Sequence, residues 1–122
     1  MVSLVSLLFG CGGHSNFQVG GLYSVEYGDG TYRVAKVLAV EKAGVHVRLY
    51  KNEWKERPQN VDPSVLSLGS VNDGDGFGMG HLPLTAKGFA AWKPALLSKE
   101  AVSKDELEGY EMWKEGGGGF WQ

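Results

Sequence analysis

Hydrophobic and polar residues alternate along the first half of the chain in short segments that predict β-strands. The segment 22–27 is rich in aromatic and β-branched residues and ends at Gly28-Asp29-Gly30, a typical hairpin turn because glycine and aspartate tolerate positive φ. A long strand is predicted over 31–41, a turn over 42–44 and a third strand over 45–50. The pattern therefore predicts three antiparallel strands joined in a meander.

The strand 31–41 is expected to lie at the centre of this sheet because both of its faces carry apolar residues. A polar connection over 54–63 follows the meander, and the apolar run 65–68 predicts a fourth strand. The glycine-rich stretch 69–80 predicts an irregular loop. The residues expected to form the core are Leu22, Val34, Leu38, Val45, Val47 and Leu49.

The second half of the chain carries the start and stop signals of two helices. Thr85 is placed to cap a helix over 86–92, Pro94 prevents its extension, and 94–97 is suited to a further strand. Ser103 and Glu106 have the spacing of a capping box for a second helix, which Gly116 would stop. We expect both helices to cover the apolar side of the sheet.

These elements predict an α+β protein: a small bent antiparallel sheet, or an SH3-like barrel, with two short C-terminal helices. The strand pattern over Leu22–Tyr50 and Val65–Leu68 resembles the SH3/Tudor-like small barrels. Residues 1–122 are expected to form a single domain. Its parts are an N-terminal extension over 1–16, a β-meander over 20–70, a helical part over 81–115 and a flexible tail over 116–122.

Composition narrows the function classes. The net charge of −2 argues against a dedicated nucleic-acid binder. The chain of 122 residues contains one cysteine, which excludes an intramolecular disulfide. The apolar run at the N-terminus is too short to span a membrane. A single cysteine is typical of a protein in the reducing cytoplasm, which is the predicted location. The segment Leu8-Phe9-Gly10-Cys11 resembles the lipobox of bacterial lipoproteins, and lipid anchorage at Cys11 is therefore the alternative.

Aromatic residues on or beside the predicted hairpins are the weak candidates for a binding site. In Tudor-like modules, aromatics at strand ends hold methylated lysine or arginine through cation–π attraction, but no defined cage motif is present here. Ordinary packing between strands is the competing interpretation. The candidates are Tyr23, Tyr27, Tyr32, Tyr50 and Trp54.

Histidine chemistry offers one further candidate. His81 follows the glycine-rich loop. To act as a general base, it would need a nearby carboxylate such as that of Asp73 or Asp75. The competing role of His81 is a backbone hydrogen bond that holds the loop. His46, in a strand beside Arg48, is expected at the surface. The loop fails the EF-hand pattern, so neither a metal nor a cofactor is predicted, and no residue is assigned a catalytic role.

The sequence therefore predicts a small non-catalytic interaction module that binds another macromolecule, with a protein as the favoured partner and an unassigned oligomeric state. The alternatives are a Tudor/SH3-like reader of nucleic acid or modified peptide, a small hydrolase-like enzyme that uses His81 with Asp73 or Asp75, and a lipoprotein anchored at Cys11.

Overall fold

The computed structural model describes residues 17–28, 30–69 and 77–120, which form an open, curved β-sheet with two short α-helices. The strands are β1 (Gly21–Tyr27), β2 (Thr31–Val40), β3 (Val45–Leu49), β4 (Met79–Leu84) and β5 (Ala95–Lys99). All neighbours are antiparallel, in the order β4-β3-β2-β1-β5. The predicted α+β class and the central position of β2 are confirmed. Within the described ranges, β4 and β5 do not pair with each other, so the sheet is not closed.

The first three strands follow the predicted meander. Gly28 and Gly30 both have positive φ, at 73° and 89°, which is the backbone conformation that the turn between β1 and β2 requires. All six residues expected in the core are at most 2 % exposed. The alternation of side chains in these strands was therefore sufficient to predict their pairing and the burial of these six apolar residues.

The fourth strand differs from the prediction. Residues 63–65 form the 3₁₀ helix η1 (Pro63–Val65), and the chain continues without regular structure to 68. Leu66 and Leu68 nevertheless pack on the sheet, which accounts for the apolar run. The true fourth strand, β4, begins inside the predicted glycine-rich loop and contains Pro83 at the edge of the sheet, where a missing N–H is tolerated.

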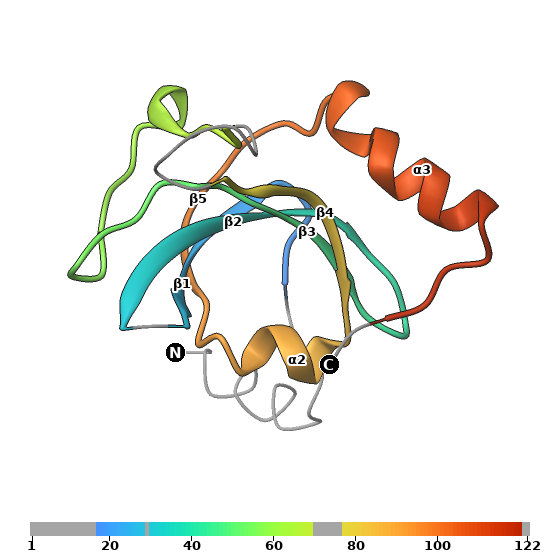
Figure 1. Cartoon of the computed structure of the whole chain (residues 1–122), viewed down its shortest axis with the longest axis horizontal. Coiled ribbons are helices and arrows are strands. Elements are labelled where there is room, and N and C mark those ends of the chain that lie inside the picture. Colours follow the sequence, from blue (N-terminus) through green and yellow to red (C-terminus); the bar gives the residue numbers. More distant parts are fainter. Residues whose placement is uncertain (1–16, 29, 70–76, 121–122) are drawn as a thin grey trace, which may run out of the picture.

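The sheet has two differently covered faces, and Figure 1 shows it curving around the helix α2 (Ala86–Ala90) on its concave side. Side chains of this inner face form the larger core around Phe89 of α2, which is fully buried. Thr85 caps α2 as expected, because its hydroxyl accepts the Gly88 N–H at 2.9 Å. The inner core also includes Tyr23, Val25, Ala35, Val37, Val45, Val47, Leu49, Leu82 and Leu84.

The second helix lies on the opposite, outer face, so the expectation that both helices share one side was wrong. It begins with the 3₁₀ turn η2 (Asp105–Leu107), continues as α3 (Glu108–Glu115) and ends at Gly116. The predicted capping box is present: the Ser103 N–H donates to Glu106 at 2.9 Å, and the Glu106 N–H donates to the Ser103 hydroxyl at 3.2 Å. Successive side chains of a strand point alternately to the inner and the outer face of the sheet. Polar residues such as His46 and His81 accordingly point away from the inner core and toward α3.

None of the helices that the structure describes has the length and apolar character needed to cross a bilayer.

Candidate functional site

The end of the β1–β2 hairpin gathers aromatic side chains. The register pairs Glu26 with Tyr32 and Tyr27 with Thr31, so Tyr27 and Tyr32 point to opposite faces of the hairpin. Trp92, in the segment after α2, meets the ring of Tyr27 edge-on with 5.2 Å between centroids. On the other face, Trp54 exchanges two backbone hydrogen bonds with Tyr32. One tight turn thereby places four aromatic side chains at one end of the molecule.

Two adjoining clefts open beside this turn. One of about 270 Å³ lies between Tyr27, Tyr32 and Trp92, and the other, of about 310 Å³, lies between Tyr27, Arg33 and Glu53. Gly28 borders both, and a Cβ added there would meet nothing within 4 Å. We call the lining of the two clefts the hairpin surface; its members are Glu26, Tyr27, Gly28, Gly30, Tyr32, Arg33, Glu53, Ala91 and Trp92.

Two arginines of the chain itself lie against the tyrosine rings of this surface. Arg33 lies 5.0 Å from the Tyr27 ring centroid, and Arg57 lies at the same distance from Tyr32. Arg33 is only 8 % exposed, and it donates to the carbonyls of Tyr50 and Phe77. Arg57 donates to the Ser24 hydroxyl at 2.7 Å. Each tyrosine ring therefore already has a guanidinium neighbour.

The structure brings only some of the predicted aromatic candidates together. Tyr32 and Trp54 pair at the hairpin end and Tyr27 lies on the other face of the same turn, whereas Tyr23 packs against Phe89 in the inner core. Tyr50 is 8 % exposed and belongs to the smaller core of the outer face. Tyr23 and Tyr50 consequently have packing roles in this fold.

His81 lies elsewhere, in β4, where it forms a pair with His46 of β3. His46 Nδ1 and His81 Nε2 are 2.9 Å apart, and the two rings are inclined by only 9°. The expected surface position of His46 was wrong, because its side chain is completely buried beneath α3. Sequence reasoning missed this pair because β4 was not recognised, and with it the face that the two histidines share.

The surroundings of the pair disfavour protonation. Burial lowers the pKa of His46 and outweighs Glu41, whose carboxylate favours the charged form. Burial, together with the neighbouring His46, lowers the pKa of His81 to about 4. Glu41 Oε2 lies 3.3 Å from His46 Nε2 and accepts a 2.7 Å hydrogen bond from the Tyr110 hydroxyl, which raises the pKa of Tyr110 to about 12.

The hydrolase hypothesis required a deep pocket that contains His81 together with Asp73 or Asp75. The rings of Tyr110 and Trp113 cover His46 at 4.5 and 4.4 Å between centroids. Asp73 and Asp75, the proposed acidic partners of His81, lie outside the described residues, as does Cys11. In the part of the chain that the structure describes, no group of three or more His, Cys, Asp or Glu side chains is arranged to hold a metal ion.

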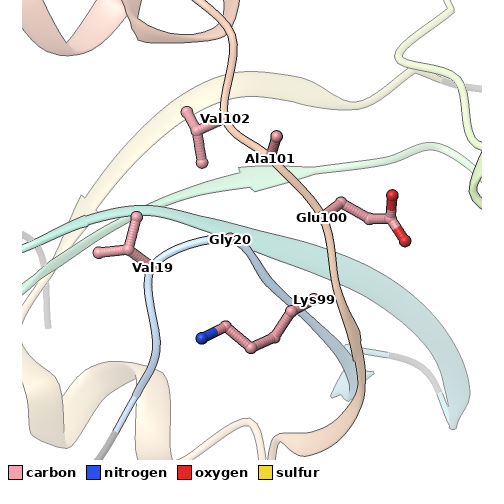
Figure 2. A pocket seen from close by; sticks show the side chains of 6 residues that line it. All are labelled: Val19, Gly20, Lys99, Glu100, Ala101 and Val102. Atoms are coloured by element: carbon pink, nitrogen blue, oxygen red, sulfur yellow. The ribbon is translucent and has the colours of Figure 1, made fainter.

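A third hollow, of about 500 Å³, lies between Val19-Gly20 and the segment 99–102, where Figure 2 shows the Lys99 and Glu100 side chains extending to opposite sides. Gly20 has a φ of 85°, and its carbonyl accepts the Glu100 N–H at 2.8 Å. Part of the border of this hollow is therefore a backbone hydrogen bond that joins the chain after β5 to the segment before β1. The hairpin surface, with three aromatic rings, is the stronger candidate for binding.

Comparison with protein-family models, with curated proteins and with solved structures finds no match to this chain.

Proposed function

We propose that this protein is a small non-catalytic module that binds another protein through the hairpin surface. The observation that carries the proposal is a cleft lined by Tyr27, Tyr32 and Trp92 that adjoins a second cleft lined by Tyr27, Arg33 and Glu53, beside Gly28, where an added Cβ would meet nothing within 4 Å. Tyrosine, tryptophan and arginine are the residue types that contribute most to binding at protein interfaces. The hairpin surface contains all three.

The charges of this surface favour a protein over a nucleic acid. A nucleic-acid site presents several basic side chains to phosphates, whereas Arg33 and Arg57 donate to groups of their own chain. Glu53 is exposed at the second cleft, and the Glu26 carboxylate, beside Arg57, lines the first. Two carboxylates at the rim would repel a phosphate backbone and tolerate a mixed protein surface.

A reader of modified peptides in an SH3/Tudor-like fold is the second candidate. The curved five-stranded antiparallel sheet and the bridge between Tyr32 and Trp54 at the end of the hairpin support it. The arginines beside both tyrosine rings count against it, because a methylated cation would have to displace them. We therefore place a protein contact with aromatic anchors ahead of a cation cage. A cytoplasmic location accompanies this proposal, and lipid anchorage at Cys11 is the alternative, which the mass of the native N-terminus decides.

Affinity capture with the full chain, followed by binding measurements on the purified partner, tests the proposal. The variant Tyr27→Ser removes the wall that the two clefts share. We expect this variant to lose at least about tenfold in affinity for the partner, since central aromatic anchors contribute 2 kcal/mol or more, about thirtyfold. Met112→Gln, at a residue of α3 that is 67 % exposed and far from the hairpin in sequence, is the matched control.

Two results would contradict the proposal. One is a purified partner that binds the wild type and Tyr27→Ser equally well; the other is retention of nucleic acid in place of protein. A trimethyllysine or dimethylarginine peptide that binds the wild type and loses binding in Tyr27→Ser would support the reader instead.

A further inference from the structure

We propose that α3 and the chain through Phe120 form a latch that closes on the His46–His81 pair and opens in mild acid. This C-terminal latch, defined as residues 108–120, concerns the outer face of the sheet and is independent of the hairpin surface. The inference starts from the kind of contact that holds the latch: aromatic rings packed on the buried imidazole of His46, which is hydrogen-bonded to the partly buried imidazole of His81.

The latch fits closely onto the histidines. Three of its rings, those of Tyr110, Trp113 and Phe120, lie 4.5, 4.4 and 5.3 Å from the centroid of the His46 ring. The Trp113 indole N–H donates to the Gly119 carbonyl at 2.9 Å and folds the tail back onto the helix. Residues 116–120 of the predicted flexible tail are thereby part of the cover over His46.

Two glycines permit this close approach. A Cβ on Gly109 would lie 2.7 Å from Cβ of His81, and a Cβ on Gly44 would clash with the Leu84 carbonyl of β4 and lie 2.6 Å from the ring of Phe120. Both distances are shorter than any ordinary van der Waals contact. The glycines lie on both sides of the seam, one in the latch and one in the turn after β2, so that the sheet and the latch are shaped to each other.

Little else holds the latch in place. None of the side chains of α3 is fully buried, and within the described ranges its side-chain hydrogen bond to the sheet is the one from Tyr110 to Glu41. The segment just before the latch is fixed more firmly: Lys36 Nζ donates to the Ala101 carbonyl at 2.6 Å and to Glu106 at 3.0 Å. This attachment lets the latch swing away while η2 stays on the sheet.

Protons act directly on the contact between the imidazoles. Glu41 faces His46 Nε2, so we assign the proton of His46 to that nitrogen, which leaves Nδ1 to accept the N–H of His81 Nε2. An added proton on His81 Nδ1 places a cation under the aromatic cover. A second proton, on His46 Nδ1, places two N–H groups 2.9 Å apart and breaks the hydrogen bond.

The other charged groups near the pair come from each neighbouring element. Glu41, at the end of β2, favours a charged His46, whereas Arg48 of β3, which donates to the Gly80 carbonyl, adds positive charge on the same face. On α3, Lys114 lies 5.1 Å from the Tyr110 ring, and Glu111 lies 3.9 Å from Lys114. Of these groups, one carboxylate, that of Glu41, faces His46. Burial lowers the pKa of His46 by more than Glu41 raises it.

The direction of the pH dependence follows from this balance. A group that binds protons more weakly in the closed state favours opening as the pH falls. The pKa of His81 is about 4 in the closed state, against 6.5 for a solvated imidazole, so the ratio of closed to open latch falls about twentyfold between pH 7 and pH 5. Above the ordinary histidine pKa the latch is unaffected, and below a pH of about 4 His81 causes no further opening.

Hydrogen exchange on the full chain, corrected for the intrinsic pH dependence of exchange, measures the opening. We expect peptides covering 108–120 to lose about twentyfold in protection between about pH 7 and about pH 5, while peptides of β1–β3 keep theirs. The variant His81→Gln keeps a donor toward His46 without a proton-binding nitrogen, so its latch should stay protected at the lower pH. His14→Gln, a change at the third histidine of the chain, should behave as the wild type.

Three results would overturn the latch: constant protection of 108–120 in the wild type, equal loss in His81→Gln, or simultaneous loss across the whole sheet. If His81→Gln does not fold, ring NMR of the wild type gives the answer. The latch requires a His81 pKa well below 6.5 and α3 amide shifts that change with the same midpoint; a His81 that titrates near 6.5 refutes it.

Discussion

Gly109 shows how a single residue determines where α3 lies. Replacement by alanine adds one methyl group that would meet Cβ of His81 at 2.7 Å, while the same change raises helix propensity by about 1 kcal/mol. We expect Gly109→Ala to lower the free energy of unfolding by about 1–3 kcal/mol in urea titrations, because overpacking outweighs propensity.

Gly119→Ala is the matched control for that change, since nothing lies within 4 Å of a Cβ at this position. Its effect should stay within about 0.5 kcal/mol. A Gly109→Ala variant as stable as the wild type would mean that α3 shifts along the sheet without cost, and that its fit onto His81 is unimportant.

The side chain of Tyr110 makes the stability of the fold depend on alkaline pH. The hydrogen bond to Glu41 raises the pKa of Tyr110 to about 12, so the folded state holds the phenol proton more tightly than the unfolded chain, whose tyrosine has a pKa of 10. Its contribution is complete below pH 10 and is lost as the pH rises toward 12. Tyr110→Phe should cost about 1 kcal/mol near pH 7 and weaken the alkaline fall in stability. An unchanged alkaline limb in urea titrations would contradict this origin.

At the scale of elements, α2 depends on one side chain. Phe89 is the buried residue of this helix and contacts the rings of Phe17 at 4.8 Å and Tyr23 at 5.9 Å between centroids. We expect Phe89→Ala to lower the free energy of unfolding by about 3–5 kcal/mol in urea titrations, because it leaves a cavity in the inner core. Phe77→Ala, at a residue that is 46 % exposed, is the control with the same chemistry, and a similar loss in both would contradict the packing argument.

The elements also show what the sequence could and could not predict. The pattern of apolar and polar residues was sufficient to predict β1, β2 and β3. The helix cap at Thr85 and the capping box at Ser103 could be predicted from neighbouring residues, and both are present in the structure. In β4 the alternation is reduced to Leu82 and Leu84, beside Pro83 and after glycines. An edge strand accepts such residues because one side of it needs no hydrogen bonds, and it therefore resembles a loop in sequence.

The candidate site was only partly predictable for a related reason. Tyr27 and Tyr32 could be placed together because they flank one short turn. The approach of His46 to His81 depends on the pairing of β3 with β4, and its cover depends on α3, which crosses from a distant part of the sequence. No local pattern specifies such a contact, whereas the two faces of a recognised β4 would have indicated it.

At the scale of the whole molecule, the two faces of the sheet make different kinds of contact. The inner face holds the larger core, and the outer face carries a smaller core together with polar contacts to the C-terminal segment. Lys36, in the central strand β2, is 5 % exposed and joins the sheet to Glu106 and Ala101. The attachment of the chain after β5 therefore depends on an almost buried ion pair.

That ion pair gives the molecule a second acid-sensitive contact. Burial would raise the pKa of Glu106, but the Ser103 N–H and Lys36 outweigh burial and lower it below its ordinary value of 4.5. Its stabilising effect is complete above that value and is lost at lower pH, after the histidines have responded. Glu106→Ala should cost about 2 kcal/mol near pH 7, less than the 3–5 kcal/mol of a fully buried pair because Glu106 keeps some exposure.

The exposed Glu108→Ala, two residues along the chain, separates this effect from a general change in charge. We expect the control to unfold in urea as the wild type does and to keep the fall in stability below pH 4.5, which Glu106→Ala should lack. Equal acid profiles in the two variants would mean that Lys36 finds another carboxylate. When the latch opens, the C-terminal segment would then keep the contact of Lys36 with the Ala101 carbonyl and the backbone hydrogen bond from Glu100 to Gly20.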